Sequence, residues 1–487
     1  MTEDLNYNYF ESEEFKNSLS LFEQCREEGK SCILGSDELA DIAEFYYENG
    51  KYTLAREAAE YATTIYPDAC APRVFLARFS LALKKDCNEA WENISRISDT
   101  TLPEYFTILG EYQLARGNNK AATETFADGE TTIHEDERQD YRLDVAFLLL
   151  DYSLTKEATE WAQRITDKNS PEYKKLCARL HFEKGEHEKA IEILEKALDK
   201  NPFYTDYWNL LATIQLSADK YSDAAASSEY AIAINDGCAE SYLNLGNAYF
   251  KLCNYDKAIE AYTRFAALNE NELGEILLAR CYFCKQMAKE AIKHLAEAQK
   301  RCSDNRQNFV DIHKDLAIIY GWTGEGSKAF RHIDILKNMN YDDPELNLIE
   351  GGVLLGMNKF SKANEVFMRG YEKSELPNEY LFQVAVNFYE HNFDDVAYQM
   401  LKEIFRLEPQ RTRGLSYIAV CCNYLGLKDE FLFYLKEAVE KNVDEAKAVL
   451  SEIFPASVTP QDYYEFALKH FDKNNKRSDT KEERDKD

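Results

Sequence analysis

The sequence predicts an all-α protein, a superhelical solenoid of about twelve helical hairpins with capping helices at both ends. Three observations support this fold class. Small residues recur at intervals that cluster at 34 residues, a period typical of stacked supersecondary units. Each interval holds two apolar-periodic stretches separated by a short turn. Only 10 Pro and 19 Gly occur in 487 residues, which suits a chain made mainly of helices.

One repeat illustrates the expected hairpin. Within residues 171–202, a first helix ends near Phe182, a turn follows at Gly185, and a second helix carries Ala190 and Ala197 on one face. A small residue recurs where the two helices of each repeat must approach closely, at Ala55, Ala122, Ala158, Ala190, Ala224, Ala258, Ala291, Ala329, Ala363 and Ala397.

Counting back from these residues places the start of each repeat. The starts fall near residues 36, 70, 103, 139, 171, 205, 239, 272, 310, 344, 378 and 412. The repeats at 70 and 139 depart from the pattern, because Ala90 is displaced by one position and Ser153 stands where the turn glycine is expected. The longer interval before residue 310 indicates an inserted loop or an extended helix end, and a point where the array divides.

These spacings predict the domain organisation. Terminal repeats must cover their stacking faces, so we expect capping helices at both ends. The expected segments are 1–35 with a capping helix, 36–303 with repeats 1 to 8, 304–445 with repeats 9 to 12, 446–472 with C-terminal capping helices, and 473–487 as a disordered charged tail.

The repeats resemble a known family. Its pattern places a large residue, Leu-Gly and Tyr in the first helix, and Ala, an aromatic residue, Ala and Pro around the second. Matching residues in three repeats are Tyr242, Leu245, Gly246, Tyr249, Ala258 and Tyr262; Trp208 and Ala231; and Ala385, Phe388, Ala397 and Pro409. The chain is thus similar to the tetratricopeptide repeat (TPR) family over about residues 36–445. The resemblance implies a non-catalytic scaffold or adaptor that binds a partner's peptide or helix in a concave groove.

In that family, positions 2, 5, 9 and 12 of the first helix line the groove. The residues at these positions in the central repeats are Lys175, Arg179, Phe182, Asn209, Thr213, Asn247, Phe250 and Arg280. Amides can pair with the backbone of an extended peptide, and Lys and Arg with its acidic groups, so we expect these residues to bind a peptide. The alternative is that the aromatic residues pack on the next repeat and the polar ones pair with neighbouring acids.

The charge balance restricts the partners. A net charge of -29 disfavours binding to nucleic acid or to a membrane surface, since both require Lys and Arg on phosphate groups. Carboxylates at the second position of many first helices are stabilised by the helix dipole, and they account for part of this acidity. We find no leader and no uncharged run of spanning length, and the 12 scattered Cys suit reduced core positions, so we expect a cytoplasmic protein.

No motif points to catalysis, a metal or a cofactor. Gly321 to Lys328 has the glycine spacing of a phosphate loop but ends Ser-Lys, and it falls at an expected turn between helices. Cys281 and Cys284 form the one C-x-x-C and have no second ligand pair. We therefore expect no enzyme. A second hypothesis is a structural subunit of a homo- or hetero-oligomeric assembly that uses its apolar surface, and the oligomeric state is left open.

Overall fold

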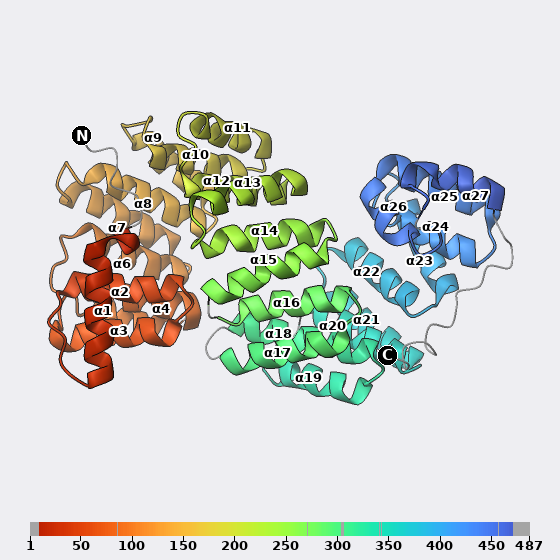
Figure 1. Ribbon diagram of the computed structural model, residues 1–487, viewed down its shortest axis with the longest axis horizontal. Helices are drawn as coiled ribbons and strands as arrows, with labels where there is room; N and C mark the ends of the chain where they lie inside the picture. The colour runs from red at the N-terminus through yellow and green to blue at the C-terminus, as the bar shows by residue number, and fades with distance from the viewer. Residues whose placement is uncertain are drawn as a thin grey trace. The chain divides into compact units, whose positions relative to one another are not determined.

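The computed structural model is an array of helical hairpins (Figure 1). It describes residues 9–470 except 85, 270, 303–305, 340, 342 and 456. Every regular element in this part of the chain is helical, and twelve antiparallel hairpins follow one another. The prediction of an all-α solenoid of stacked hairpins is confirmed.

The chain divides into two compact units, Met1–Phe309 and Val310–Asp487. The hairpins of the N-terminal unit are α2 (Ser36–Glu48) with α3 (Tyr52–Ile65), α4 (Cys70–Phe79) with α5 (Cys87–Ile94), α6 (Pro103–Ala115) with α7 (Asn119–Thr132), α8 (Arg138–Asp151) with α9 (Thr155–Arg164), α10 (Pro171–Glu183) with α11 (His187–Leu198), α12 (Thr205–Ser217) with α13 (Tyr221–Ile234), α14 (Ala239–Lys251) with α15 (Tyr255–Leu268), and α16 (Leu273–Cys284) with α17 (Ala288–Arg301).

The C-terminal unit continues the same pattern. Its first helix begins just before the division. The hairpins are α18 (Arg306–Trp322) with α19 (Gly326–Asn338), α20 (Pro344–Gly356) with α21 (Phe360–Lys373), α22 (Pro377–Glu390) with α23 (Asp394–Leu407), and α24 (Leu415–Tyr424) with α25 (Lys428–Lys441).

The hairpin turns share one backbone feature. A residue between the two helices adopts the left-handed conformation, which reverses the chain within a few residues. Eleven hairpins show it, at Gly50, Gly117, Ser153, Gly185, Asp219, Cys253, Gln286, Gly324, Asn358, Asn392 and Gly426. The phosphate-loop-like stretch is thus the turn between α18 and α19, as predicted.

The small residues predicted at the helix crossings are confirmed as core. Ala55, Ala122, Ala158, Ala190, Ala224, Ala258, Ala291, Ala329, Ala363 and Ala397 are all 0% exposed. Glycines in the first helices have the same role: a Cβ at Gly246 would lie 2.4 Å from Cε1 of Tyr262. Close helix packing therefore fixes the 34-residue pattern of small residues.

Local geometry explains the two irregular repeats. After α4 the chain forms a π-helical turn, η2 (Ser80–Lys84). A π turn holds one residue more than an α turn, which accounts for the one-position displacement of Ala90. In the other repeat, Ser153 takes the left-handed turn position with φ 59°. Both segments keep the hairpin fold.

Additional helices cover the ends of the array. At the N-terminus, η1 (Tyr9–Glu11) precedes α1 (Glu13–Glu28), which buries Phe15 and Phe22 in a core shared with the first hairpin. At the C-terminus, α26 (Val443–Leu450), η3 (Pro460–Asp462) and α27 (Tyr463–His470) follow α25. The predicted tail, 473–487, lies outside the described residues.

The cysteine prediction needs correction. Cys421 and Cys422 are buried, but Cys253 and Cys284 are exposed. Cys253 is exposed because it occupies a left-handed hairpin turn, with φ 55°. Among the described helices, none is long and apolar enough to span a membrane.

Candidate functional site

The first helices of successive hairpins contact one another in the N-terminal unit. The packed pairs are α2 with α4, α4 with α6, α6 with α8, α8 with α10, and α12 with α14. The first helices of these hairpins therefore form one layer of the unit, and their second helices form the other. On each first helix, one side packs against the second helix of the same hairpin. We call the opposite side, taken over successive first helices, the inner face. The predicted binding residues lie along it on α10, α12, α14 and α16.

The two predicted cations of α10 form ion pairs with neighbouring first helices. Nζ of Lys175 lies 2.9 Å from Oδ2 of Asp206, and NH2 of Arg179 lies 2.7 Å from Oδ1 of Asp151. The Arg179 guanidinium also lies 5.6 Å from the centre of the Phe147 ring. This stretch of the inner face is therefore close to neutral, although the sequence shows it as basic.

Asn209 and Thr213 are tied into the α12 to α14 packing. Asn209 is 1% exposed; its amide donates to Sγ of Cys238 and its Oδ1 accepts from Ser241 at 2.8 Å. Thr213 donates to the backbone oxygen of Asn209 at 3.0 Å. Asn244, one repeat later, donates to that same backbone oxygen. The structure thus places the Asn209 side chain between helices.

The remaining predicted residues are half-buried on the same face. Asn247 accepts a hydrogen bond from the Tyr262 hydroxyl at 2.8 Å. The Phe250 ring packs edge-on against Tyr255. Phe182 and Arg280 occupy the equivalent face of α10 and α16. Binding of a peptide by the eight predicted residues stays a prediction.

Carboxylates that sequence reasoning missed lie further along the inner face. Glu44 and Glu48 belong to α2, Glu111 to α6 and Asp144 to α8, and we call these four the acidic inner face. None of the described cations forms an ion pair with Glu44, Glu48 or Asp144. Glu111 pairs with Arg78 of α4, with Nε 3.1 Å from Oε2. The sequence could have revealed these acids, because they stand at positions 6, 9 and 13 when each repeat is counted from its predicted start.

Partial burial raises the pKa of each of these carboxyls. It raises the pKa of Asp144 to about 6, and Asp140 and Glu104 add repulsion. The pKa of Glu48 is raised by burial and by the charges of Glu44 and Asp206. Glu44, Glu48 and Asp144 are nevertheless exposed to water. These side chains therefore lie partly among other protein atoms and can still be reached from the solvent.

Two titratable clusters elsewhere are built from histidines. His313 and His332 approach with their Nδ1 atoms 2.8 Å apart, and His294 Nδ1 lies 2.7 Å from Glu275. The described residues contain no group of three or more His, Cys, Asp or Glu side chains placed to hold a metal ion.

One hairpin matches a known family in its sequence. A family model for the tetratricopeptide repeat matches residues 239–271, which form α14 and α15. The same hairpin geometry recurs through both units. This chain is a tetratricopeptide repeat protein. A second model, for subunit 3 of the anaphase-promoting complex, or cyclosome, matches residues 151–230 of the repeat array.

Solved structures of other repeat proteins resemble the chain at low identity. A tetratricopeptide repeat protein from Parabacteroides merdae is 17% identical over 50% of this chain and 95% of its own, with a TM-score of 0.43. Yeast Tom70 is 14% identical over 85% and 94%, with a TM-score of 0.43. The APC/C hetero-tetramer Cut9-Hcn1 gives 14% over 93% and 94%, with a TM-score of 0.38. No curated protein sequence matches significantly.

Proposed function

We propose that this repeat protein is a non-catalytic scaffold that holds a peptide or helix of a protein partner along the inner face of α2 to α16. The observation that carries the proposal is the set of accessible carboxylates on that face, of which Glu44, Glu48 and Asp144 have no ion-pair partner among the described residues. Half-buried aromatic rings, Phe182 and Phe250, continue the face. Charges and rings spaced by the repeat can contact an extended chain at many points.

Site-specific photo-crosslinking tests the location. A photoreactive amino acid replaces Phe182 or Phe250 on the inner face, and in matched controls it replaces the exposed aromatic residues Trp91 or Phe433. We expect one partner segment to be captured from the inner positions, and a synthetic copy of that segment to bind the unmodified protein. Capture restricted to the control positions would contradict the proposal.

Charge reversal tests the predicted residues themselves. Arg179→Glu replaces a cation that pairs with Asp151, and Arg280→Glu changes the same face of α16. We expect both to change the affinity for the captured segment. The prediction that these residues bind the segment fails if both variants bind it with the same affinity as the unmodified protein.

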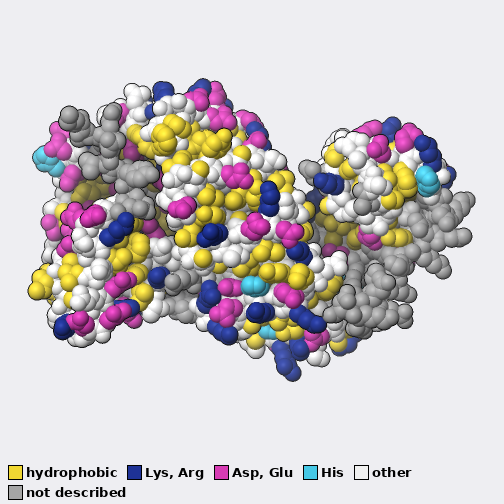
Figure 2. Space-filling model, viewed as in Figure 1, with side chains coloured by type: hydrophobic (Ala, Val, Ile, Leu, Met, Phe, Trp, Pro, Cys, Tyr) yellow, Lys and Arg dark blue, Asp and Glu magenta, His cyan; other side chains and the backbone are white. Residues whose placement is uncertain are grey.

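An exposed aromatic cluster favours a second function, assembly with other subunits. Phe203 is 68% exposed and Tyr230 is 59% exposed, with Tyr230 stacked on Trp208 at 4.8 Å between ring centres. Figure 2 shows hydrophobic side chains gathered over α10 to α14 on one side of this unit. Apolar surface of this kind is typical of interfaces. Light scattering that shows a monomer at every concentration would count against homo-oligomer formation, and unchanged binding by Phe203→Ser would count against a partner there.

A further inference from the structure

The acidic inner face carries more negative charge than the protein neutralises. Arg78 is the cation that acts on Glu44, Glu111 and Asp144, and its one ion pair among the described residues is with Glu111. Burial outweighs the attraction of Arg78, since the pKa of each of the three carboxyls is still raised. A positive group placed there would gain attraction without displacing an existing partner of Glu44 or Asp144.

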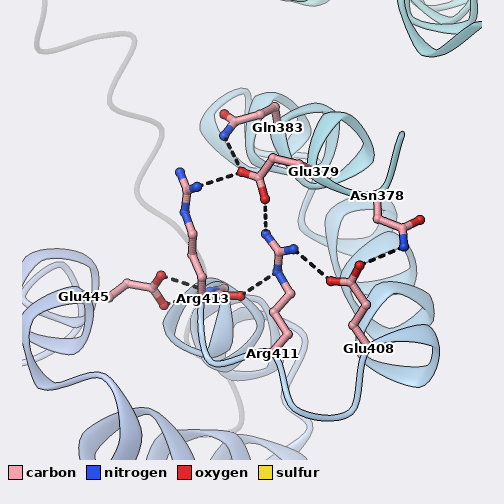
Figure 3. A network of polar contacts seen from close by, with 8 residues as sticks. Asn378, Glu379, Gln383, Glu408, Arg411, Arg413 and Glu445 are labelled. Carbon is pink, nitrogen blue, oxygen red and sulfur yellow. Dashed lines mark hydrogen bonds and ion pairs between the residues drawn. The ribbon is translucent and has the colours of Figure 1, made fainter. Parts of the chain in front are cut away.

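This surplus is not a general property of the repeat. In the C-terminal unit, Glu379 stands in the first turn of α22 and accepts from NH2 of Arg411 at 2.6 Å and from NH1 of Arg413 at 2.7 Å. Figure 3 shows Arg411 between Glu379 and Glu408. Glu345 of α20 likewise pairs with Lys314 at 2.6 Å. Among the described residues, Asp41, Glu44, Glu48, Glu111, Asp144 and Glu240 of the N-terminal unit have a pKa that is raised by burial.

The shape of the N-terminal unit restricts what can reach these acids. Figure 1 shows its hairpins curling from α2 round to α16. The turn after α2 meets the loop before α16, where a Cβ at Gly50 would lie 2.1 Å from Oδ1 of Asn269. Across the interior, Glu48 of α2 and Asp206 of α12 are close enough to repel each other. The curl therefore brings α2 close to the loop before α16, and the limited room in front of the acids suits a chain segment better than the surface of a folded domain.

We propose that the partner segment is basic, and that its Lys or Arg side chains lie on the acidic inner face formed by α2, α6 and α8. This inference rests on the proposed function, because it names the chemistry of the segment that the inner face holds. The segment's apolar or polar remainder continues over α10 to α16, where Lys175 and Arg179 are already neutralised by the protein's own acids. Charge complementarity selects this occupant over an acidic peptide.

Two synthetic peptides test the inference against the full-length protein. One carries Lys at every third position between Gly, Ser and Leu, and the other has Glu in place of each Lys. Fluorescence anisotropy measures their affinity over a range of salt concentrations. We expect the Lys peptide alone to bind, with an affinity that falls as salt rises, because partly exposed charges are screened. Equal binding of both peptides would overturn the inference.

A matched pair of variants locates the binding. Glu44→Gln with Glu111→Gln and Asp144→Asn removes three inner charges, and Glu124→Gln with Asp128→Asn and Glu160→Gln removes three exposed charges from the second helices α7 and α9. We expect the inner variant to bind the Lys peptide about tenfold more weakly, as three partly exposed ion pairs imply, and the outer variant to bind it as the unmodified protein does. Equal losses would overturn the inference. Thermal unfolding confirms that both variants are folded.

The two proposals fail separately. If crosslinking captures a segment on the inner face that has no Lys or Arg and binds the inner variant normally, the basic-segment inference is wrong and the scaffold function stands. If no segment is captured from Phe182 or Phe250, and the Lys peptide binds the outer variant as weakly as the inner one, both are wrong.

Discussion

Acids on the first helices of the two units differ in their ion pairing. In the N-terminal unit, Glu44 and Asp144 have no ion-pair partner among the described residues, and burial raises their pKa. In the C-terminal unit, Glu379 is held by Arg411 and Arg413, at 2.6 and 2.7 Å. Glu44 and Asp144 of the first repeats thus differ from Glu379, although other acids of the N-terminal unit, such as Asp151 and Asp206, are paired.

The difference is local in origin. Arg411 and Arg413 belong to the loop between α23 and α24, and both guanidinium groups lie over the Phe382 ring, at 4.5 and 5.0 Å from its centre. The next residue, Gly414, has φ 101° and donates its N–H to Glu445 of α26. In the C-terminal unit Glu379 therefore holds this loop in place, and the loop in turn contacts the capping helix α26, which ties Glu379 to stability.

The largest effect is expected from breaking this network. Arg411 has an 11% exposed side chain and bonds to both Glu379 and Glu408. Arg411→Ala leaves two carboxylates short of a partner in partly buried surroundings, so we expect a loss of about 2 kcal/mol in the free energy of unfolding. Urea unfolding measures it, with hydrogen exchange of α22 and α24 as the local readout.

Arg406→Ala is the matched control. Arg406 lies in the last turn of α23, shortly before Arg411, but its side chain is 68% exposed and it pairs with Glu403 within its own helix. We expect no measurable change. Equal losses in the two variants would show that the network contributes nothing beyond the general effect of removing a cation.

The second effect concerns the pH response of the C-terminal unit. His313 is 1% exposed, with its Nδ1 bonded to Nδ1 of His332. Burial, with repulsion from His332, lowers the pKa of His313 to about 4 from 6.5. The folded state therefore stays neutral where the unfolded state takes up a proton. The neutral histidine therefore does not lower the free energy of unfolding above pH 6.5. As the pH falls from 6.5 toward 4, proton uptake by the unfolded state lowers that free energy by about 2 kcal/mol.

Comparison of variants isolates this pair from the many carboxylates. We expect the stability difference between the unmodified protein and His332→Asn to change between pH 7 and pH 4, in thermal unfolding and in hydrogen exchange of α18 and α19. His134→Asn is the control, because its side chain is 78% exposed in the N-terminal unit. A difference that is flat with pH for His332→Asn would rule out the pair as the titrating group.

The fold was predictable because close helix packing restricts which residue types can occupy the helix crossings. A buried crossing tolerates only a small side chain, so Ala190 and its equivalents reveal the period. The turn residues were less visible, since Ser153, Asp219 and Cys253 take left-handed positions that glycine takes elsewhere. The exposure of Cys253 follows from that turn geometry, which residue type alone does not indicate.

The candidate site was harder to predict because charge pairing depends on neighbouring repeats. Register placed Lys175 and Arg179 on the inner face, but their partners, Asp206 and Asp151, are about one repeat away in opposite directions. Burial of Asn209 depends on hydrogen bonds to the next hairpin. The unneutralised acids of the first repeats could be found only by comparing every repeat at the same positions.

The smallest effect tests the N-terminal side of the comparison. The pKa of Asp144 is raised by burial to about 6, above its ordinary 3.8, so its charge destabilises the folded state above pH 6. That cost fades as the pH falls toward 3.8, where the folded protein is protonated first. Asp144→Asn should therefore raise the melting temperature at pH 8 by about 1 °C and leave it unchanged at pH 4. Asp128→Asn, on the exposed face of α7, should change neither value. A lower melting temperature for Asp144→Asn at pH 8 would mean that Asp144 stabilises its unit as Glu379 does, and the contrast between the two units would not hold at that position.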